Sequence, residues 1–146
     1  MSYIAYVPRD FTTNPDSFGR GGLLQWPPVV PADLPHGPGV TVAMRAKVMA
    51  QLKARRRAAQ IQETYATRMR KSIKEQRTTA KAYANEAGIS YDRFLKILRG
   101  QVIMRLEDLA SADLILKDIT EFAFVPTPGQ AQRPVPAIPS GSSRAA

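Results

Sequence analysis

The sequence predicts an all-α protein, a small bundle of four to five helices preceded by a long basic helix. Two observations point to this fold class. Residues 41–77 contain neither Pro nor Gly and are rich in Ala, Arg, Lys, Gln and Met, which favour helix. All 12 prolines lie in residues 1–40 and 126–146, so the middle of the chain is free of helix breakers. Four regions follow: 1–40, 41–77, 78–125 and 126–146.

The two ends differ from the middle in composition. Residues 1–40 form a Pro/Gly-rich arm that we expect to be irregular, neither helical nor well packed. The arm nevertheless carries Tyr3, Tyr6, Phe11, Phe18 and Trp26. These aromatic residues leave two interpretations open, docking on the folded core or contact with a protein partner. Residues 126–146 are mostly Pro, Gly, Ser, Ala and Gln, and they predict a flexible tail.

The long helix has a predicted start and a predicted packed end. Thr41 follows Pro38-Gly39 and is the expected N-cap. Tyr65, Met69 and Ile73 recur at helical spacing, so the last turns should pack as the first helix of the following domain. A strong dimeric coiled coil is not indicated, because only one of the two heptad rows along the helix is consistently apolar.

Residues 78–125 predict a domain that contains two short helices, 79–87 and 90–99, around a turn at Gly88. Gly88 suits a turn with positive φ, and Ser90 is the expected N-cap of the second helix. The predicted core of this unit is Tyr83, Ala84, Ala87, Gly88, Ile89, Phe94 and Ile97. A further helix should run from 105 to about 115. Its predicted apolar face is Leu106, Leu109, Ala110, Leu114 and Leu116. The alternative is an ordinary helical hairpin whose apolar residues are only core.

The run Tyr83-Ala84-Asn85-Glu86-Ala87-Gly88-Ile89-Ser90 resembles the "LAxxAGVS" core of the lambda-repressor-like (Cro/CI, Xre-type) helix-turn-helix family. Arg99-Gly100 and the run 106–109 (LEDL) are similar to the family's "RG" and "LExL" segments. The resemblance covers residues 65–116. The sequence departs from the pattern at Ala80, where the family usually has a polar phosphate-contacting residue, and at Ile103-Met104, before the last helix.

The resemblance implies that residues 90–99 form a recognition helix in the DNA major groove. The expected base contacts are Tyr91, Asp92 and Lys96, of which Lys96 would donate to guanine and Asp92 would accept from cytosine N4. The expected backbone contacts are Ser90, Arg93, Arg99 and Lys81, together with Arg55, Arg56 and Arg57 of the long helix.

The charge distribution favours a polyanionic partner. The net charge is +9, and residues 41–77 alone hold 11 Lys and Arg against Glu63 and Glu75. Basic residues concentrated beside a helix-turn-helix would neutralise phosphates. A solvated helix face is the alternative interpretation.

Several function classes find no support in the sequence. The chain has no Cys and a single His, and it lacks a P-loop, a GxGxxG and an HExxH motif. We therefore expect no enzyme activity, no cofactor and no metal site. No apolar run approaches the length of a membrane span, and the N-terminus does not resemble a signal peptide. The expected location is the cytoplasm, in association with the nucleoid.

The sequence thus predicts a sequence-specific regulator of transcription that binds double-stranded DNA. By resemblance it is a repressor of the phage or mobile-element kind, and a homodimer on DNA. Two alternatives stay open. One is an antitoxin-like protein that binds a protein partner through the arm and regulates its own expression. The other is a sequence-indifferent DNA-coating protein that uses the basic helix.

Overall fold

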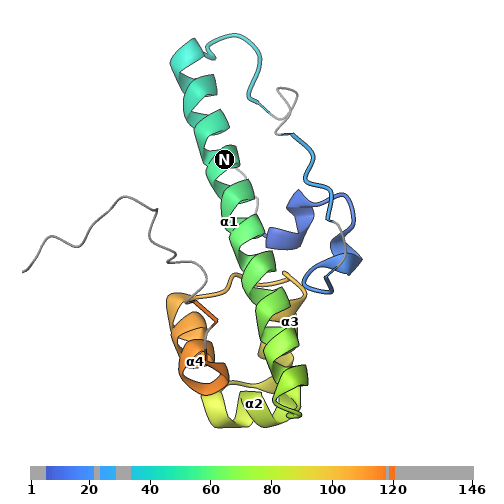
Figure 1. Cartoon of the computed structure of the whole chain (residues 1–146). Coiled ribbons are helices and arrows are strands. Elements are labelled where there is room, and N and C mark those ends of the chain that lie inside the picture. Colours follow the sequence, from blue (N-terminus) through green and yellow to red (C-terminus); the bar gives the residue numbers. More distant parts are fainter. Residues whose placement is uncertain (1–5, 22–23, 29–33, 118, 121–146) are drawn as a thin grey trace, which may run out of the picture.

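The computed structural model describes residues 6–21, 24–28, 34–117 and 119–120 (Figure 1). All regular elements in these residues are helical. Two short 3-10 helices, η1 (Pro8–Phe11) and η2 (Pro15–Ser17), precede four α-helices. The α-helices are α1 (Val42–Glu75), α2 (Ala80–Ala87), α3 (Tyr91–Leu98) and α4 (Leu106–Leu116). The all-α prediction is confirmed for this part of the chain, whereas the predicted tail, 126–146, lies outside it.

Helix α1 is one uninterrupted helix of 34 residues. Thr41 caps it, because its hydroxyl accepts a hydrogen bond from the Met44 backbone N–H at 3.1 Å. The buried positions are Ala59, Gln62, Ala66, Met69 and Ile73. Their alternating spacing of three and four residues places them on one stripe of the second half of the helix. The first half projects beyond the other helices in Figure 1, with few buried side chains.

Helices α2 and α3 are short and are defined by local signals at their ends. The Thr79 and Ser90 hydroxyls accept hydrogen bonds from Ala82 N–H at 3.1 Å and from Arg93 N–H at 3.2 Å. Gly88 ends α2 with φ +70°, the left-handed conformation that a residue with a Cβ adopts at a cost. The predicted caps and turn are therefore confirmed.

Helix α4 begins and ends close to the predicted residues but turns a different face to the core. Leu106 and Leu114 are each 82% exposed. The buried positions are Asp108, Ala112 and Leu116. The predicted apolar face is therefore wrong in part. Hydrogen bonds from Arg93 and from the Arg105 backbone hold the Asp108 carboxylate inside, so α4 is rotated about its axis relative to the prediction, and Leu106 and Leu114 point outward.

The arm packs against the helices. Phe18 is 1% exposed and belongs to the same core cluster as Met69, Tyr83 and Phe94. The Arg9 backbone N–H donates to the Gly100 carbonyl at 3.0 Å, which ties η1 to the end of α3. The expectation of a poorly packed arm is wrong for residues 6–21, because aromatic burial there outweighs the effect of the prolines. Of the two interpretations, docking on the core is what the structure shows for this part of the arm.

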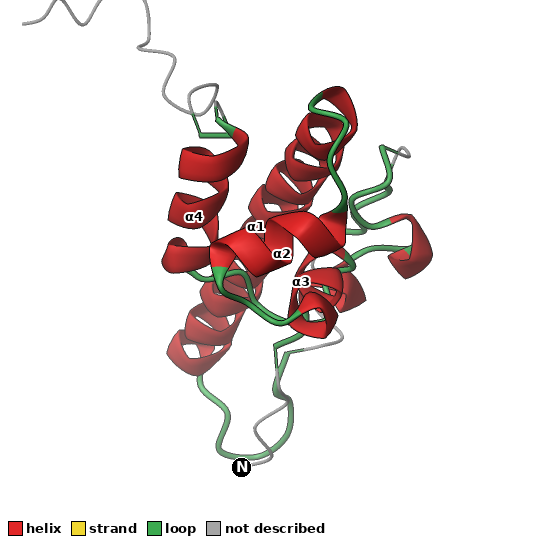
Figure 2. Ribbon diagram, turned by 90° about the horizontal axis from the view of Figure 1, so that it is seen from below, coloured by secondary structure: helices red, strands yellow, loops and turns green. Residues whose placement is uncertain are grey.

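The helices enclose one core. Figure 2 shows α2 lying across α1, with α3 and α4 beside it. Both α3 and α4 contact α1 and α2, and η1 contacts α1. The predicted core residues Tyr83, Ala84, Phe94 and Ile97 are at most 2% exposed, and Ala87 and Ile89 are partly buried against them. This packing fixes which face of α3 points outward.

Candidate functional site

The outward face of α3 is a continuous polar stripe. Asp92, Lys96 and Arg99 are exposed at positions i, i+4 and i+7, and Tyr91 beside them is 43% exposed. The Lys96 Nζ lies 2.7 Å from the Asp92 carboxylate. An exposed pair of this kind contributes well under about 1 kcal/mol, so either side chain exchanges it for another partner at little cost. Asp92 and Lys96 therefore share one exposed face, and Tyr91, about 100° around the helix from Asp92, lies at its edge.

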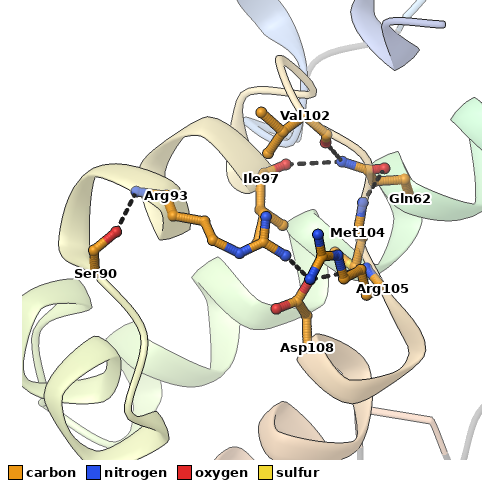
Figure 3. Close-up of polar contacts among 8 residues, drawn as sticks. All are labelled: Gln62, Ser90, Arg93, Ile97, Val102, Met104, Arg105 and Asp108. Carbon is orange, nitrogen blue, oxygen red and sulfur yellow. Dashed lines mark hydrogen bonds and ion pairs between the residues drawn. The ribbon is translucent and has the colours of Figure 1, made fainter.

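Arg93, which the sequence predicts as a phosphate contact, is engaged inside the protein. Its Nη2 lies 2.6 Å from the Asp108 Oδ2, and the same oxygen accepts the Arg105 backbone N–H at 2.8 Å (Figure 3). Asp108 is 8% exposed, so this ion pair is shielded from water on its acidic side. In this structure the Arg93 side chain therefore joins α3 to the start of α4.

The N-terminal ends of α2 and α3 both face solvent. Ser90 is exposed, and its hydroxyl is occupied as the cap of α3. Lys81 is exposed in the first turn of α2. Helix N-termini favour anions, because their unpaired N–H groups carry partial positive charge. Both predicted residues therefore stand at ends suited to a phosphate.

The basic cluster of α1, Arg55, Arg56 and Arg57, is divided between two surroundings. The guanidinium of Arg55 lies 6.0 Å from the centre of the Tyr6 ring, and its backbone carbonyl accepts the Tyr6 hydroxyl at 2.9 Å. Burial raises the pKa of Tyr6 to about 12, although the Arg55 charge opposes this shift. Arg56 donates to the Trp26 carbonyl at 2.8 Å. Two of the three arginines thus hold the arm, and Arg57 is the exposed one.

Gln62 is the main polar residue that the sequence did not single out. It is 5% exposed, and its amide nitrogen donates to the carbonyls of Ile97 at 3.1 Å and Val102 at 2.8 Å (Figure 3). Its amide oxygen accepts the Met104 N–H at 2.9 Å. One side chain thus connects α1 to the end of α3 and to the segment that leads into α4. The only sequence signal was its place on the buried stripe of α1.

Leu98 is a buried apolar residue that the sequence did not single out, and for Phe18 the sequence left docking on the core as one of two interpretations. Leu98 is 2% exposed, and its position four residues after Phe94 could have revealed it. Phe18 lies in an irregular segment, where no periodicity indicates burial. Its ring lies against Gly100, at a point where an added Cβ would come within 2.8 Å of the ring carbons. Gly100 of the predicted "RG" pair therefore provides the space for the arm.

Comparisons with known proteins return no similarity: no family model, no curated protein and no solved structure matches the chain. In the described ranges, no helix is long and apolar enough to cross a membrane. Those same ranges contain no group of three or more His, Asp and Glu side chains placed to hold a metal ion.

Proposed function

We propose that this chain is a sequence-specific double-stranded-DNA-binding regulator of transcription. In this proposal α2, the Gly88 turn and α3 form a helix-turn-helix, and α3 enters the major groove. By occupying an operator the protein would block the polymerase and act as a repressor.

One observation carries the proposal, the two-sided character of α3. Phe94, Ile97 and Leu98 fix one side of the helix in the core, while Asp92, Lys96 and Arg99 extend along the other. A recognition helix needs this arrangement, because base-reading side chains must be held rigidly on an exposed face. An ordinary helical hairpin also buries one face and exposes a polar one. On α3 the exposed face presents two donors, Lys96 and Arg99, and an acceptor, Asp92, along one line.

The chemistry of the outward face supports the assignment of roles. Lys96 is a donor suited to guanine O6 and N7, and Asp92 is an acceptor suited to cytosine N4. The ring of Tyr91 is sufficiently exposed to meet a thymine methyl group. Lys81 and the N-terminal ends of both helices would hold the phosphates on either side of the groove.

A second candidate function, sequence-indifferent coating of DNA, is favoured by the first half of α1. This half projects from the bundle and carries Arg45, Lys47, Lys53 and Arg57 in exposed positions. A basic helix of this kind gives affinity through counterion release without choice of sequence. The antitoxin-like alternative is less well supported, because Phe18 and Trp26 of the arm pack on the chain's own core.

We also propose that the regulator acts as a homodimer. One helix-turn-helix covers few base pairs, and paired units read half-sites about 34 Å apart along DNA. The candidate contact regions are the long helix and residues 122–125. The second of these regions lies outside the described residues. Sedimentation with and without the selected operator measures the subunit number on DNA.

Selection of bound duplexes from a random pool at physiological salt tests the proposal. We expect one motif to be enriched by the wild-type protein and relaxed at single positions by Lys96→Ala and by Asp92→Ala. Each good base contact discriminates by about 1 to 3 kcal/mol, which is roughly a tenfold effect or more at the affected base pair.

The chain offers matched controls for both substitutions. Lys71 and Glu75 form an exposed i, i+4 pair on α1, with 3.7 Å between the Lys71 Nζ and the carboxylate. Lys71→Ala and Glu75→Ala remove the same groups from a pair of the same kind, and they should leave the motif intact. Uniform enrichment by the wild type, lost only on neutralising the exposed Arg45, Lys47, Lys53 and Arg57, would replace the regulator with the coating protein.

A further inference from the structure

Three arginines from distant parts of the chain meet at the C-terminal end of α3. Gly19 of the arm packs so closely that a Cβ there would lie 2.8 Å from the Leu98 carbonyl oxygen and 3.2 Å from the Arg70 Nε. Arg20 follows Gly19, and Arg99 follows Leu98. The arm, α1 and α3 therefore come together here, each with an arginine at or next to the contact, and the charges of Arg20 and Arg99 act on Arg70. We call Arg20, Arg70 and Arg99 the arginine triad.

The triad has no acidic partner in the described part of the chain. The ion pairs there join Lys71 to Glu75, Arg93 to Asp108 and Lys96 to Asp92. The Nε of Arg70 is buried and has no hydrogen-bond acceptor. Burial and the charges of Arg20 and Arg99 together lower the pKa of Arg70, which is the direction that unrelieved repulsion between like charges gives.

The helix end does not balance this charge. The C-terminus of a helix carries about half an elementary negative charge, against three full positive charges here. Repulsion among these charges destabilises the isolated protein, and an anion bound at the cluster would relieve it. Guanidinium groups match the oxygens of phosphate in geometry and in charge.

We propose that Arg20, Arg70 and Arg99 together bind one phosphate group of a DNA backbone, beside the groove that α3 reads. The assignment rests on the proposed function for its source of phosphate, but the anion site itself does not. Arg99 continues the exposed stripe of Asp92 and Lys96, so a phosphate on the triad lies in line with the proposed base contacts. The docked arm then completes the binding surface.

If the three arginines bind the same phosphate, the salt dependence of DNA binding should change by a predictable amount in the variants. For the full-length protein on a duplex, log K against log salt concentration loses about one unit of slope for each phosphate contact removed. We expect Arg20→Gln and Arg99→Gln each to weaken binding several-fold. The double substitution should reduce the slope by about one unit in total, because both groups serve the same phosphate.

Lys71→Gln is the control. Lys71 is exposed on α1, where it pairs with Glu75, and it belongs neither to the arginine triad nor to the basic first half of the helix. The same loss of charge there should leave the slope unchanged. A slope reduced by about two units in the double variant, or by none, would overturn the shared site.

A second experiment needs no DNA. At equal ionic strength, replacing chloride by 50 mM inorganic phosphate should raise the melting temperature of the wild type by roughly 4 °C more than that of Arg20→Gln or Arg99→Gln. General salting-in or salting-out acts on all variants alike, so the difference isolates the site. Equal shifts in all three proteins would overturn the proposal.

The two experiments separate the two proposals. A phosphate-specific shift lost in the variants, in a protein that selects no duplex motif, supports the anion site and removes the regulator. Motif selection without a difference in slope or melting temperature supports the regulator and removes the triad site. Arg70→Gln is left out of the main comparison, because Arg70 is partly buried and its replacement also changes packing.

Discussion

At the scale of single residues, Gln62 shows how one buried amide can organise three segments. Both ends of its side chain are used, by two carbonyl groups on one side and by a backbone N–H on the other. Ile97 lies in the last turn of α3, and its carbonyl also accepts the Gly100 N–H at 3.1 Å, whereas the Val102 carbonyl and the Met104 N–H lie between α3 and α4. A Gln side chain supplies two N–H donors and one acceptor oxygen, which is the set that these three backbone groups require.

Replacing this amide by a hydrocarbon of similar size should be costly. Gln62→Leu leaves the Met104 N–H and the Val102 carbonyl, both of partly buried residues, without this partner, whereas the Ile97 carbonyl keeps the Gly100 N–H. We expect the free energy of unfolding to fall by about 2 to 4 kcal/mol, measured by urea denaturation. Gln51→Leu, an exposed change on the same helix, should alter it by less than about 0.5 kcal/mol. Equal effects would show that the hydrogen bonds contribute nothing.

Tyr83 gives the protein a dependence on alkaline pH. Burial, and to a smaller extent the Asp108 charge, raises the pKa of Tyr83 from 10.0 to about 12. The unfolded chain therefore loses this proton first, so the stabilisation is complete below pH 10 and is lost as pH rises toward 12. We expect Tyr83→Phe to remove about 2 to 3 kcal/mol of the decline in unfolding free energy over this interval. The remaining decline should come from Tyr6, whose pKa is also raised. If the unfolding free energies of the wild type and of Tyr83→Phe declined in parallel with pH, Tyr83 would not be the cause.

At the scale of elements, the glycines that follow α2 and α3 differ in whether the arm packs against them. Gly88 and Gly100 have nearly equal φ, +70° and +67°, but a Cβ at Gly88 would meet nothing within 4 Å whereas one at Gly100 would meet the Phe18 ring at 2.8 Å. Gly88→Ala should cost about 1 kcal/mol of backbone strain. Gly100→Ala should cost about 2 kcal/mol more, because the aromatic ring must also move. Urea denaturation measures both.

A double substitution separates strain from displacement of the arm. Phe18→Ala alone should destabilise the protein by about 3 to 5 kcal/mol, as for other buried phenylalanines. In the Gly100→Ala background the same change should cost clearly less, because the clash is then absent. Additive effects would mean that the ring and the glycine do not interact.

The elements that the sequence predicts well are those defined by neighbours in the chain. Thr79, Gly88 and Ser90 act within three or four residues of their own positions, and their roles as caps and turn are confirmed. Gln62 and Phe18 act on segments 35 or more residues away, and no local pattern encodes such contacts. The Arg93–Asp108 pair is also a long-range contact. It could not be predicted, because the apolar pattern of α4 favours a face that would leave Asp108 exposed.

The candidate site also divides into local and long-range features. The face formed by Asp92 and Lys96 follows from helical phase alone, once Phe94 and Ile97 are taken as buried. The arginine triad could not be predicted, since its members come from the arm, α1 and α3. Arg55 and Arg56 looked like free positive charge in the sequence, and only the docked arm reveals their other contacts.

At the scale of the whole molecule, the arm and the helices form one packed body in the described residues. Phe18 lies in the core, while Leu24 and Trp26 pack against it. Tyr6 and Trp26 are further held by hydrogen bonds to α1. If the arm were a separate linker, its release would leave the helices folded. If it completes the core, its release removes part of the apolar surface that stabilises them.

The single tryptophan makes this difference measurable. Trp26 reports on the arm through its fluorescence, and circular dichroism at 222 nm reports on the helices. We expect the two urea transitions of the wild type to coincide, because arm and bundle unfold together. Phe18→Ala should move the fluorescence transition to lower urea than the helical one, since the arm then loses its anchor in the core. Separate transitions already in the wild type would mean that the arm docks too weakly to belong to the cooperative unit, and Arg20 would then be a poor partner for Arg70 and Arg99.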